Sequence, residues 1–308
     1  MGQWSGVLSD YKHIIGYGIG QYYDYVNSFL PADIKLDYLC DIRWKEFSGE
    51  LDGIRVISPD ELREVQDAVV IVFSNNQQSY CSITRNLERM ALPYVHVDQL
   101  LGRRRTISGR ELRESGNEIY EDKWGNCIEF CSDIEDEIRI HFHGENNRVI
   151  LGKELRVGGL DIFCERNALC RIGDCTEIDS ARIFVTDGSI EVGKDCLFAC
   201  GIILRNHDGH HIFDKASGRR LNYAGNIKIG NHVWLGESAV LLGNASVGDN
   251  SVVGMMAVTS SSFPGGTVLA GNPARIIKRD ICWSKDTTYL YNRDFFDECH
   301  EKKAQKYF

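Results

Sequence analysis

Residues 229–258 read IGNHVWLGESAVLLGNASVGDNSVVGMMAV and repeat one pattern every six positions. An aliphatic residue stands first in each hexad, at Ile229, Leu235, Leu241, Val247 and Val253. Apolar spacings of three and four predict a helix and a spacing of two predicts a strand, so a period of six fits neither. It fits short strands that each turn one aliphatic side chain inward, joined by corners where small residues relieve crowding of the backbone.

The same period recurs upstream in three shorter registers. These are Leu151, Val157, Phe163 and Leu169, then Ile172, Ile178, Phe184 and Ile190, then Val192, Phe198 and Leu204. The breaks at 169/172 and 190/192 predict bulges or shortened coils. Stacked coils bury a column of aliphatic residues, so we expect residues 106–280 to form an all-β solenoid.

The 308-residue chain carries a net charge of −9 and 11 cysteines, with 43% hydrophobic residues. Its length fits two domains, and its negative charge argues against a general nucleic-acid or membrane-surface binder. The amino terminus, MGQWSGVLSDYKH, lacks the features of a signal peptide, and no stretch is apolar enough for a membrane span. We therefore expect a cytoplasmic protein with reduced, mostly buried cysteines, although a zinc site on their spacing stays open.

Residues 1–105 predict a Rossmann-like α/β domain with a small parallel sheet. Strands are expected within 34–41, 53–57, 68–74 and 93–98, and an apolar run precedes the glycines at 16, 18 and 20. Helices are expected after residue 20, after Ser58 as N-cap, and over 82–90. The polar residues 102–120 are expected to form a linker, with the RRR run at 103–105 in solvent.

The stretch GYGIG at 16–20 lies between a predicted strand and a predicted helix. Glycines there let a backbone approach a phosphate, but Gln21 stands where GxGxxG requires glycine, so a simple tight turn remains the alternative. With GIRVISPDEL at 53–62, the stretch loosely resembles the N-terminal domain of bacterial sugar acetyltransferases that act on UDP-linked amino sugars. That resemblance implies a nucleotide or nucleotide-sugar site.

The stretch RNHDGHHIFD at 205–214 holds three of the nine histidines of the chain. It lies outside the six-residue register, because Leu204 ends one run and Ile229 begins the next, so residues 205–228 are expected to protrude as a loop. A catalytic base, a metal site and a surface cluster are the alternatives. Three histidines on a short irregular loop cannot easily share one ion and no HExxH is present, so we favour the base and expect no metal.

The segment DGHHIFDKASGRRLNYAGNIKIGNHVWLG at 208–236, followed by AGNPARIIKR at 270–279, resembles the hexapeptide-repeat acyltransferases. Within them it is most similar to bacterial capsular-polysaccharide and sialic-acid O-acetyltransferases, and the likeness covers about residues 125–280. The resemblance implies a left-handed parallel β-helix and a homotrimer with the acetyl-CoA site between subunits. It also implies acetyl transfer to a hydroxyl of a capsular polysaccharide.

The resemblance maps the catalytic histidine, two positions after an aspartate, onto Asp208 and His210. A histidine suits a general base near neutral pH, because its ordinary pKa is about 6.5. His207 and His211 depart from the family pattern, which has serine and a small polar residue there. Asp208 or Asp214 would orient the imidazole as the third group of a triad does, and the sequence does not choose between them.

Trp234 matches a family tryptophan beside the acetyl group, with a packing tryptophan at a coil corner as the alternative. The resemblance implies that the pantetheine arm of acetyl-CoA follows Gly236, Ser238, Gly254 and Ala257. Arg275, Lys278 and Arg279 would contact its phosphates, or would be solvated surface charges. On the loop, Lys215, Arg219 and Arg220 suggest an acidic glycan as acceptor.

Two further functions stay open. One is N-acetylation of a nucleotide-linked amino sugar, which the N-terminal domain suggests. The other is a non-catalytic β-helix scaffold. Residues 281–308 are expected to form a charged, aromatic helical tail that caps the coil or packs across a subunit.

Overall fold

The computed structural model describes residue 8 and residues 10–285. The chain divides into two compact units, and the boundary lies between Arg104 and Arg105 in the sequence. Most of the expected C-terminal helical tail, residues 286–308, lies outside the described residues, and the described part, 281–285, contains no helix. No helix of the described residues is long and apolar enough to cross a membrane.

The first unit is built on a six-stranded sheet with the order β3-β4-β2-β1-β5-β6. All neighbouring strands are parallel except β3 and β4. The strands are β1 (His13–Tyr17), β2 (Tyr38–Cys40), β3 (Glu50–Leu51), β4 (Ile54–Ile57), β5 (Ala68–Val72) and β6 (Tyr94–His96). Every residue of β5 is buried, which explains its uninterrupted apolar sequence AVVIV.

The helices of this unit are α2 (Gln21–Val26), α3 (Gln77–Arg89) and α4 (Val97–Leu100), with 3-10 turns at Asn27–Phe29, Trp44–Phe47 and Glu61–Glu64. The helix α3 starts five residues before the expected range, because the side chain of Asn76 caps it by accepting a hydrogen bond from Ser79 N. At the expected cap, Ser58 Oγ accepts from Glu61 N and the Glu61 carboxylate accepts from Ser58 N. This reciprocal pair of hydrogen bonds is a capping box, but a single 3-10 turn follows it instead of the expected α-helix.

The predicted linker is wrong. Residues 105–121 form β7 (Arg105–Ser108), α5 (Gly109–Glu114) and β8 (Ile119–Glu121). The polar sequence hid these elements because β7 and β8 are the end strands of two different sheets of the solenoid, and most of their residues are exposed. The strand β7 runs antiparallel to β10 (Ile138–Phe142).

The arginine run at 103–105 is solvated at Arg104 and Arg105, as predicted, and is not solvated at Arg103. Arg103 is buried and donates a hydrogen bond to the Tyr22 hydroxyl, and Arg104 pairs with Asp98 at 3.2 Å. Arg105 pairs with Glu111. Each guanidinium therefore has a partner within its own unit.

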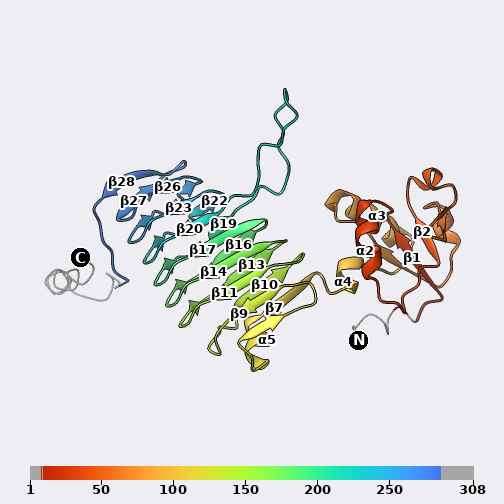
Figure 1. The fold of residues 1–308 in the computed structure, drawn as a ribbon, viewed down its shortest axis with the longest axis horizontal. Helices are drawn as coiled ribbons and strands as arrows, with labels where there is room; N and C mark the ends of the chain where they lie inside the picture. Colours follow the sequence, from red (N-terminus) through yellow and green to blue (C-terminus); the bar gives the residue numbers. More distant parts are fainter. Residues whose placement is uncertain (1–7, 9, 286–308) are drawn as a thin grey trace. The chain divides into compact units, whose positions relative to one another are not determined.

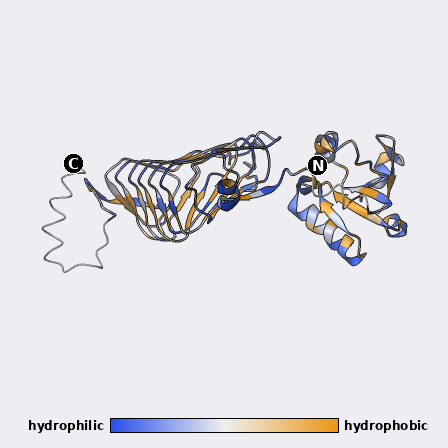
Figure 2. Cartoon of the chain, turned by 90° about the horizontal axis from the view of Figure 1, so that it is seen from below, coloured by the Kyte–Doolittle hydropathy of each residue, from blue (hydrophilic) through white to orange (hydrophobic). Residues whose placement is uncertain are grey.

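The second unit is a parallel β-helix with three sheets (Figures 1 and 2). The first sheet holds β7, β10, β13 (Leu160–Cys164), β16 (Ala181–Val185), β19 (Ile202–Arg205), β22 (Val240–Leu242) and β25 (Val258–Thr259). The second holds β8, β9 (Cys127–Glu129), β11 (Arg148–Leu151), β14 (Ala168–Ile172), β17 (Gly188–Val192), β20 (Ile227–Ile229), β23 (Ser246–Val247) and β26 (Ser262–Phe263). The third holds β12 (Arg156–Val157), β15 (Glu177–Ile178), β18 (Leu197–Phe198), β21 (Trp234–Leu235), β24 (Val252–Val253), β27 (Thr267–Ala270) and β28 (Arg275–Arg279). From β10 on, the chain visits the three sheets in rotation.

The hexad residues at 229–253 point into one continuous core, as predicted. Ile229, Leu235, Leu241, Val247 and Val253 are each at most 2% exposed. In these upper coils Leu235 pairs with Val253 and Leu241 pairs with Thr259, so partners stand 18 positions apart. Three sides of six residues each make such a coil, which is why the period is strict here.

Three residues of the upstream registers were predicted inward and face outward instead: Phe163, Leu169 and Phe184. In the lower coils Leu160 pairs with Ala181 and Ile183 pairs with Leu204, 21 positions apart. The longer coils carry five-residue strands in which every second side chain is buried. The period of two therefore replaces the period of six.

The described cysteines form no disulfide, but fewer of them are buried than expected. Cys164 and Cys170 lie in the core of the β-helix, and burial raises the pKa of Cys170 to about 12. Cys81, Cys175 and Cys200 are exposed. The buried thiols act as small core residues.

The outward rings form a stack on the first sheet. The ring of Phe163 lies 4.3 Å from that of His141 and 4.8 Å from that of Phe184, and the Arg205 guanidinium lies 4.2 Å from the Phe184 ring. These residues occupy one register row of neighbouring strands. The row ends at Arg205, where the chain leaves the coil.

Asp161 holds the base of this stack. It accepts two hydrogen bonds from Arg139 at 2.7 and 2.8 Å, and His141 Nε2 lies 2.9 Å from Oδ1. Arg139 lowers the pKa of Asp161 most, burial raises it and His141 lowers it further, leaving the pKa at about 2.

We expect Asp161→Asn to lower the free energy of unfolding at pH 7 by about 1–2 kcal/mol. Because the pKa in the folded state lies below the unfolded value of about 3.9, this stabilisation is present above that value and is lost as the pH falls toward 2. Urea unfolding of both proteins between pH 7 and pH 3 measures the difference. A difference that stays constant over this range contradicts the assignment.

Candidate functional site

The predicted loop is a long flap, residues 206–226, between β19 and β20. Figure 1 shows it projecting away from the coil. Asn206, 1% exposed, anchors its base: the side chain accepts from Thr186 N at 3.0 Å and donates to Thr186 O at 2.8 Å. Its carbonyl accepts from Gly225 N, which closes the loop. The flap therefore begins and ends on fixed backbone.

Inside the flap, Asn222 holds the histidine segment. Its Oδ1 accepts from Ile212 N at 2.7 Å, and its Nδ2 donates to the carbonyl of His210 at 2.6 Å and to Asp208 Oδ2 at 2.9 Å. Phe213 and Arg220 form an antiparallel bridge above it. The backbone of His210 is thus positioned, although the segment has no regular secondary structure.

The imidazole of His210 is exposed and forms no hydrogen bond or ion pair with the described residues. Neither candidate orienting carboxylate contacts it in this chain. Asp208 is bound by Asn222, and Asp214 accepts from the backbone and the hydroxyl of Ser217 at 2.7 and 2.6 Å. Those bonds from Ser217 lower the pKa of Asp214. Asp214 therefore shapes the tip of the flap.

The other two histidines of the flap line a cavity of about 300 Å³ between the flap and the coil, the flap cavity. His207 is half-buried, and burial lowers the pKa of its imidazole. The remaining wall residues are Glu165, Arg166, Thr186, Asp187, Gly209, Arg220, Tyr223 and Ala224. Of the three cations predicted to bind an acceptor, Arg220 lines this cavity, and Lys215 and Arg219 lie exposed at the tip.

Trp234 lies on the outer side of the third sheet and is 39% exposed. Its ring lies 5.9 Å from that of Trp283, which belongs to a short C-terminal strap, residues 281–285. His232, two residues before Trp234, adopts a left-handed backbone with φ of 53°. The strap, through Trp283, therefore covers one side of Trp234 next to the turn at His232.

The strap is fixed by a pair of reciprocal contacts. Trp283 Nε1 donates to the carbonyl of His232 at 2.8 Å, His232 Nε2 lies 3.0 Å from the carbonyl of Trp283, and the two rings stack at 4.2 Å. His232 Nδ1 lies 2.9 Å from Asp195 Oδ2, and Lys285 pairs with Asp195 at 2.8 Å. Burial raises the pKa of Asp195, but Lys285 and His232 outweigh it and the pKa is lowered.

We expect Trp283→Phe to lower the free energy of unfolding by about 1–2 kcal/mol, because the stack survives while the buried carbonyl of His232 loses its donor. Chemical denaturation measures the change. Trp44→Phe, at a half-buried tryptophan of the first unit, is the matched control, with an expected change within about 0.5 kcal/mol. Equal effects of the two substitutions would show that the strap bond adds nothing.

The residues predicted along the pantetheine arm lie at successive corners between the third and first sheets. Gly236 and Ser238 stand between β21 and β22, and Gly254 stands one coil higher, where Met256 N donates to Glu237 O. A Cβ at Gly236 would lie 2.7 Å from Met255 N, so the close spacing of the coils requires glycine there. Ala257, by contrast, is fully buried in the core and is a packing residue.

Arg275, Lys278 and Arg279 are exposed on β28, the last strand of the third sheet. Lys278 and Arg279 form no ion pair with the described residues, and Arg275 donates to the carbonyl of Ala274. They are free to meet an anion and also protect a sheet edge from pairing.

The flap and Trp234 occupy different sides of the triangular coil. The flap leaves at the corner between the first and second sheets, whereas Trp234 lies in the third sheet. No contact joins His210 to Trp234 among the described residues. Within one chain the two predicted site residues are therefore separate.

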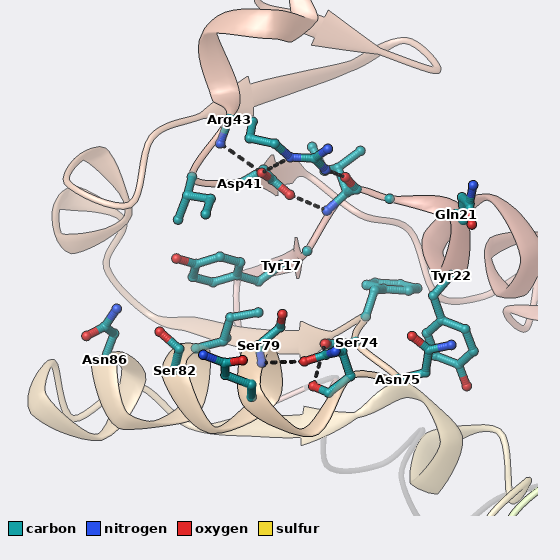
Figure 3. A pocket seen from close by; sticks show the side chains of 18 residues that line it. Tyr17, Gln21, Tyr22, Asp41, Arg43, Ser74, Asn75, Ser79, Ser82 and Asn86 are labelled. Atoms are coloured by element: carbon teal, nitrogen blue, oxygen red, sulfur yellow. Dashed lines mark hydrogen bonds and ion pairs between the residues drawn. The ribbon is translucent and has the colours of Figure 1, made fainter. Parts of the chain in front are cut away.

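The first unit contains a larger cavity of about 570 Å³ (Figure 3). The loops after β1, β2 and β5 surround it, at the point where the strand order reverses. Figure 3 shows Tyr17 between Asp41 and Arg43 on one side and the polar face of α3, with Ser79, Ser82 and Asn86, on the other.

Asp41 occupies the position from which a dinucleotide-binding fold contacts a ribose. Here its Oδ2 accepts from Ile19 N at 2.7 Å, and its Oδ1 accepts from Arg43 N at 2.8 Å and Nε at 3.2 Å. The carboxylate therefore fixes the glycine loop. A Cβ at Gly18 would lie 2.6 Å from Phe73 O, and φ there is +101°, so this glycine serves the turn itself.

Sequence reasoning missed Asn206, Asn222 and Trp283. An asparagine in a polar loop carries no signal that distinguishes a buried anchor from a surface residue. Trp283, a large aromatic residue in a charged tail, carried a signal that it packs somewhere, but not where. Among the described residues no cluster of histidine, cysteine or carboxylate side chains is arranged to hold a metal ion.

Comparison with known proteins supports the resemblance to the hexapeptide-repeat acyltransferases. A family model described as bacterial transferase hexapeptide (six repeats) matches residues 226–260, the part of the coil with the strict period. The polysialic acid O-acetyltransferase of Neisseria meningitidis is 31% identical over 170 residues, which cover 54% of this chain and 77% of that protein. A putative lipopolysaccharide biosynthesis O-acetyl transferase of Escherichia coli K12 is 31% identical over 166 residues, 50% of this chain and 80% of that one.

The polysialic acid O-acetyltransferase of Escherichia coli O1:K1 is 37% identical over 138 residues, which cover 44% of this chain and 45% of that protein. The chain thus spans less than half the length of this relative. Among solved structures, the polysialic acid O-acetyltransferase OatWY is 30% identical and covers 50% of this chain and 79% of its own, with a TM-score of 0.43.

Proposed function

The chain belongs to the hexapeptide-repeat acetyltransferases, and on that premise we propose that it transfers an acetyl group from acetyl-CoA to a hydroxyl of a bacterial surface polysaccharide. The observation that carries the proposal is the His210 segment, which is anchored through its backbone while the imidazole stays exposed and unpaired. A general base must be free to accept a proton from the acceptor. Cytoplasmic location and left-handed winding remain predictions from the sequence.

In the proposed reaction the imidazole of His210 takes the proton of the acceptor hydroxyl as the oxygen attacks the thioester carbonyl. The bond between carbonyl carbon and sulfur then breaks, and the proton passes to the leaving CoA thiolate. The thioester is already activated, so the step needs no covalent enzyme intermediate. The corners at Gly236, Ser238 and Gly254 would hold the pantetheine arm, and Arg275, Lys278 and Arg279 would pair with the phosphates.

We further propose a homotrimer in which the flap of one subunit meets Trp234 of the next. The separation of the two residues within one chain supports this arrangement. So does an apolar row on the outside of the third sheet: Leu197, Trp234, Val252 and Val268 stand side by side there.

Complementation tests the shared site. Purified His210→Ala and Trp234→Ala proteins are unfolded together, refolded at equal amounts and assayed for CoA release with capsular glycans. In a cyclic trimer every mixed assembly keeps one intact site, so about a quarter of the wild-type activity is expected to return. No recovery, with trimers formed, would place both residues in the site of a single chain.

The cavity of the first unit favours a second candidate function, binding of a nucleotide or nucleotide-sugar in a Rossmann-like domain. Its volume and its position at the reversal of strand order support this, with Arg43 as the cation beside it. The corresponding reaction is N-acetylation of a nucleotide-linked amino sugar. Acetyl-CoA turnover with UDP-amino sugars, compared with capsular glycans, distinguishes the two, and no turnover with any acceptor would support a scaffold.

A further inference from the structure

The flap cavity has hydrogen bonds that anchor its walls. Asn206 fixes its flap wall to Thr186, and Arg166 bonds Asp187 through Nε at 3.1 Å and Nη2 at 3.0 Å on its coil wall. The loop base is closed by the bond between Gly225 N and Asn206 O. A cavity whose walls are held in this way loses little conformational entropy when a ligand enters.

The charges of the cavity are not all compensated. Arg166 and Asp187 neutralise each other, whereas the guanidinium of Arg220 has no carboxylate partner among the described residues. Its Nε donates to the carbonyl of Asn222, and the group lies 4.9 Å from the Tyr223 ring, so its terminal nitrogens remain available. The carboxylate of Glu165 forms no ion pair with a described cation, and its charge acts on His207, where it opposes the lowering of the pKa by burial.

His207 adds a neutral polar group. Burial lowers the pKa of its imidazole, and the ring has no hydrogen-bond partner within the described residues. A neutral imidazole offers one donor and one acceptor, which suits a hydroxyl group. The cavity thus combines a guanidinium without a carboxylate partner with a carboxylate and an imidazole that form no hydrogen bond with the described residues.

We propose that the flap cavity holds one carboxylated sugar residue of the acceptor, with Arg220 bound to its carboxylate and His207 and Glu165 bound to its hydroxyls. This inference rests on the proposed function and assigns the acceptor site to residues of one chain. A guanidinium binds a carboxylate through two parallel hydrogen bonds, and the remaining groups match a polyhydroxylated ring. His207 and Arg220 are specificity-determining residues, and His210 remains the base.

The test compares Arg220→Gln with Arg171→Gln, a control at an exposed arginine on the outer side of β14. Acetyl transfer is measured with a carboxylated capsular oligosaccharide and with the same oligosaccharide after reduction of its carboxyl groups. We expect Arg220→Gln to raise KM for the carboxylated acceptor at least about tenfold, with kcat within about twofold and KM for the reduced acceptor unchanged. Arg171→Gln is expected to behave as wild type.

His207→Asn is the second variant, and it is expected to raise KM for both acceptors because it removes a hydroxyl contact. Thermal melts confirm that each variant is folded. Equal effects of Arg220→Gln on both acceptors, or no effect on either, would overturn the proposal.

Saturation-transfer NMR with the carboxylated oligosaccharide and no acetyl-CoA distinguishes a failure of the proposed function from a failure of the cavity assignment. Binding to wild type that Arg220→Gln abolishes, without any transfer, would overturn the proposed function and keep the cavity assignment. If wild type transfers acetyl and Arg220→Gln leaves binding of the oligosaccharide unchanged, the cavity assignment would be overturned and the proposed function would be kept.

Discussion

Replacing His210 by alanine is expected to lower kcat for acetyl transfer by about 10²–10⁴-fold, the range that a general base contributes. The acceptor hydroxyl then loses the group that takes its proton, and no neighbouring carboxylate can substitute, since Asn222 binds Asp208 and Ser217 binds Asp214. Steady-state kinetics of CoA release measures the loss. The KM for acetyl-CoA is expected to change little, because His210 is not among the residues proposed to hold the pantetheine arm or the phosphates.

The fold should be unaffected by this change. The His210 side chain forms no bond with the described residues, and Asn222 holds only its carbonyl, which alanine retains. The free energy of unfolding is therefore expected to stay within about 0.5 kcal/mol of wild type. His211→Ala is the informative companion: a larger loss of kcat in that variant than in His210→Ala would transfer the role to the neighbouring histidine.

The sequence predicts the β-helix best where coil length is regular. Between Ile229 and Val258 each coil has three six-residue sides, so the inward positions can be read directly. Lower in the coil, five-residue strands alternate, and Phe163 and Phe184 stack outside the sheet although their spacing resembled core positions. Corner length, which sets that spacing, depends on backbone packing between coils and leaves no local signal.

The sequence predicted which residues belong to the flap but not which contacts they form. The break in the repeat located the flap, and the catalytic and acceptor roles of its histidines and arginines stay predictions. Arg219 and Arg220 are identical and adjacent in sequence, yet only Arg220 lines the cavity, at the point where its backbone bridges to Phe213. Asn222 acts on backbone 10 and 12 positions away, at Ile212 and His210, a relationship that only the folded loop creates.

The close stacking of coils has a consequence that can be measured at Gly144, which lies buried at a corner between the first and second sheets. A Cβ there would lie 1.8 Å from the carbonyl oxygen of Glu165 in the next coil. That backbone cannot move away easily, because His143 N bonds Cys164 O and Asn126 Nδ2 bonds Gly144 O. We expect Gly144→Ala to lower the free energy of unfolding by about 3 kcal/mol, at the upper end of the cost of overpacking.

Gly159→Ala is the matched control. It also lies at a coil corner, but the nearest heavy atom to its Cβ would be Ser180 Cβ at 3.9 Å, an ordinary contact. Its expected change is within about 0.5 kcal/mol. Urea unfolding of both variants measures the difference in their free energies of unfolding. Because each coil contacts only its neighbours, the loss of packing in Gly144→Ala should begin at the junction between Gly144 and Glu165. Equal stability of the two variants would mean that the coils can separate at this corner without cost, and that the small residues of the repeat are not required by backbone crowding.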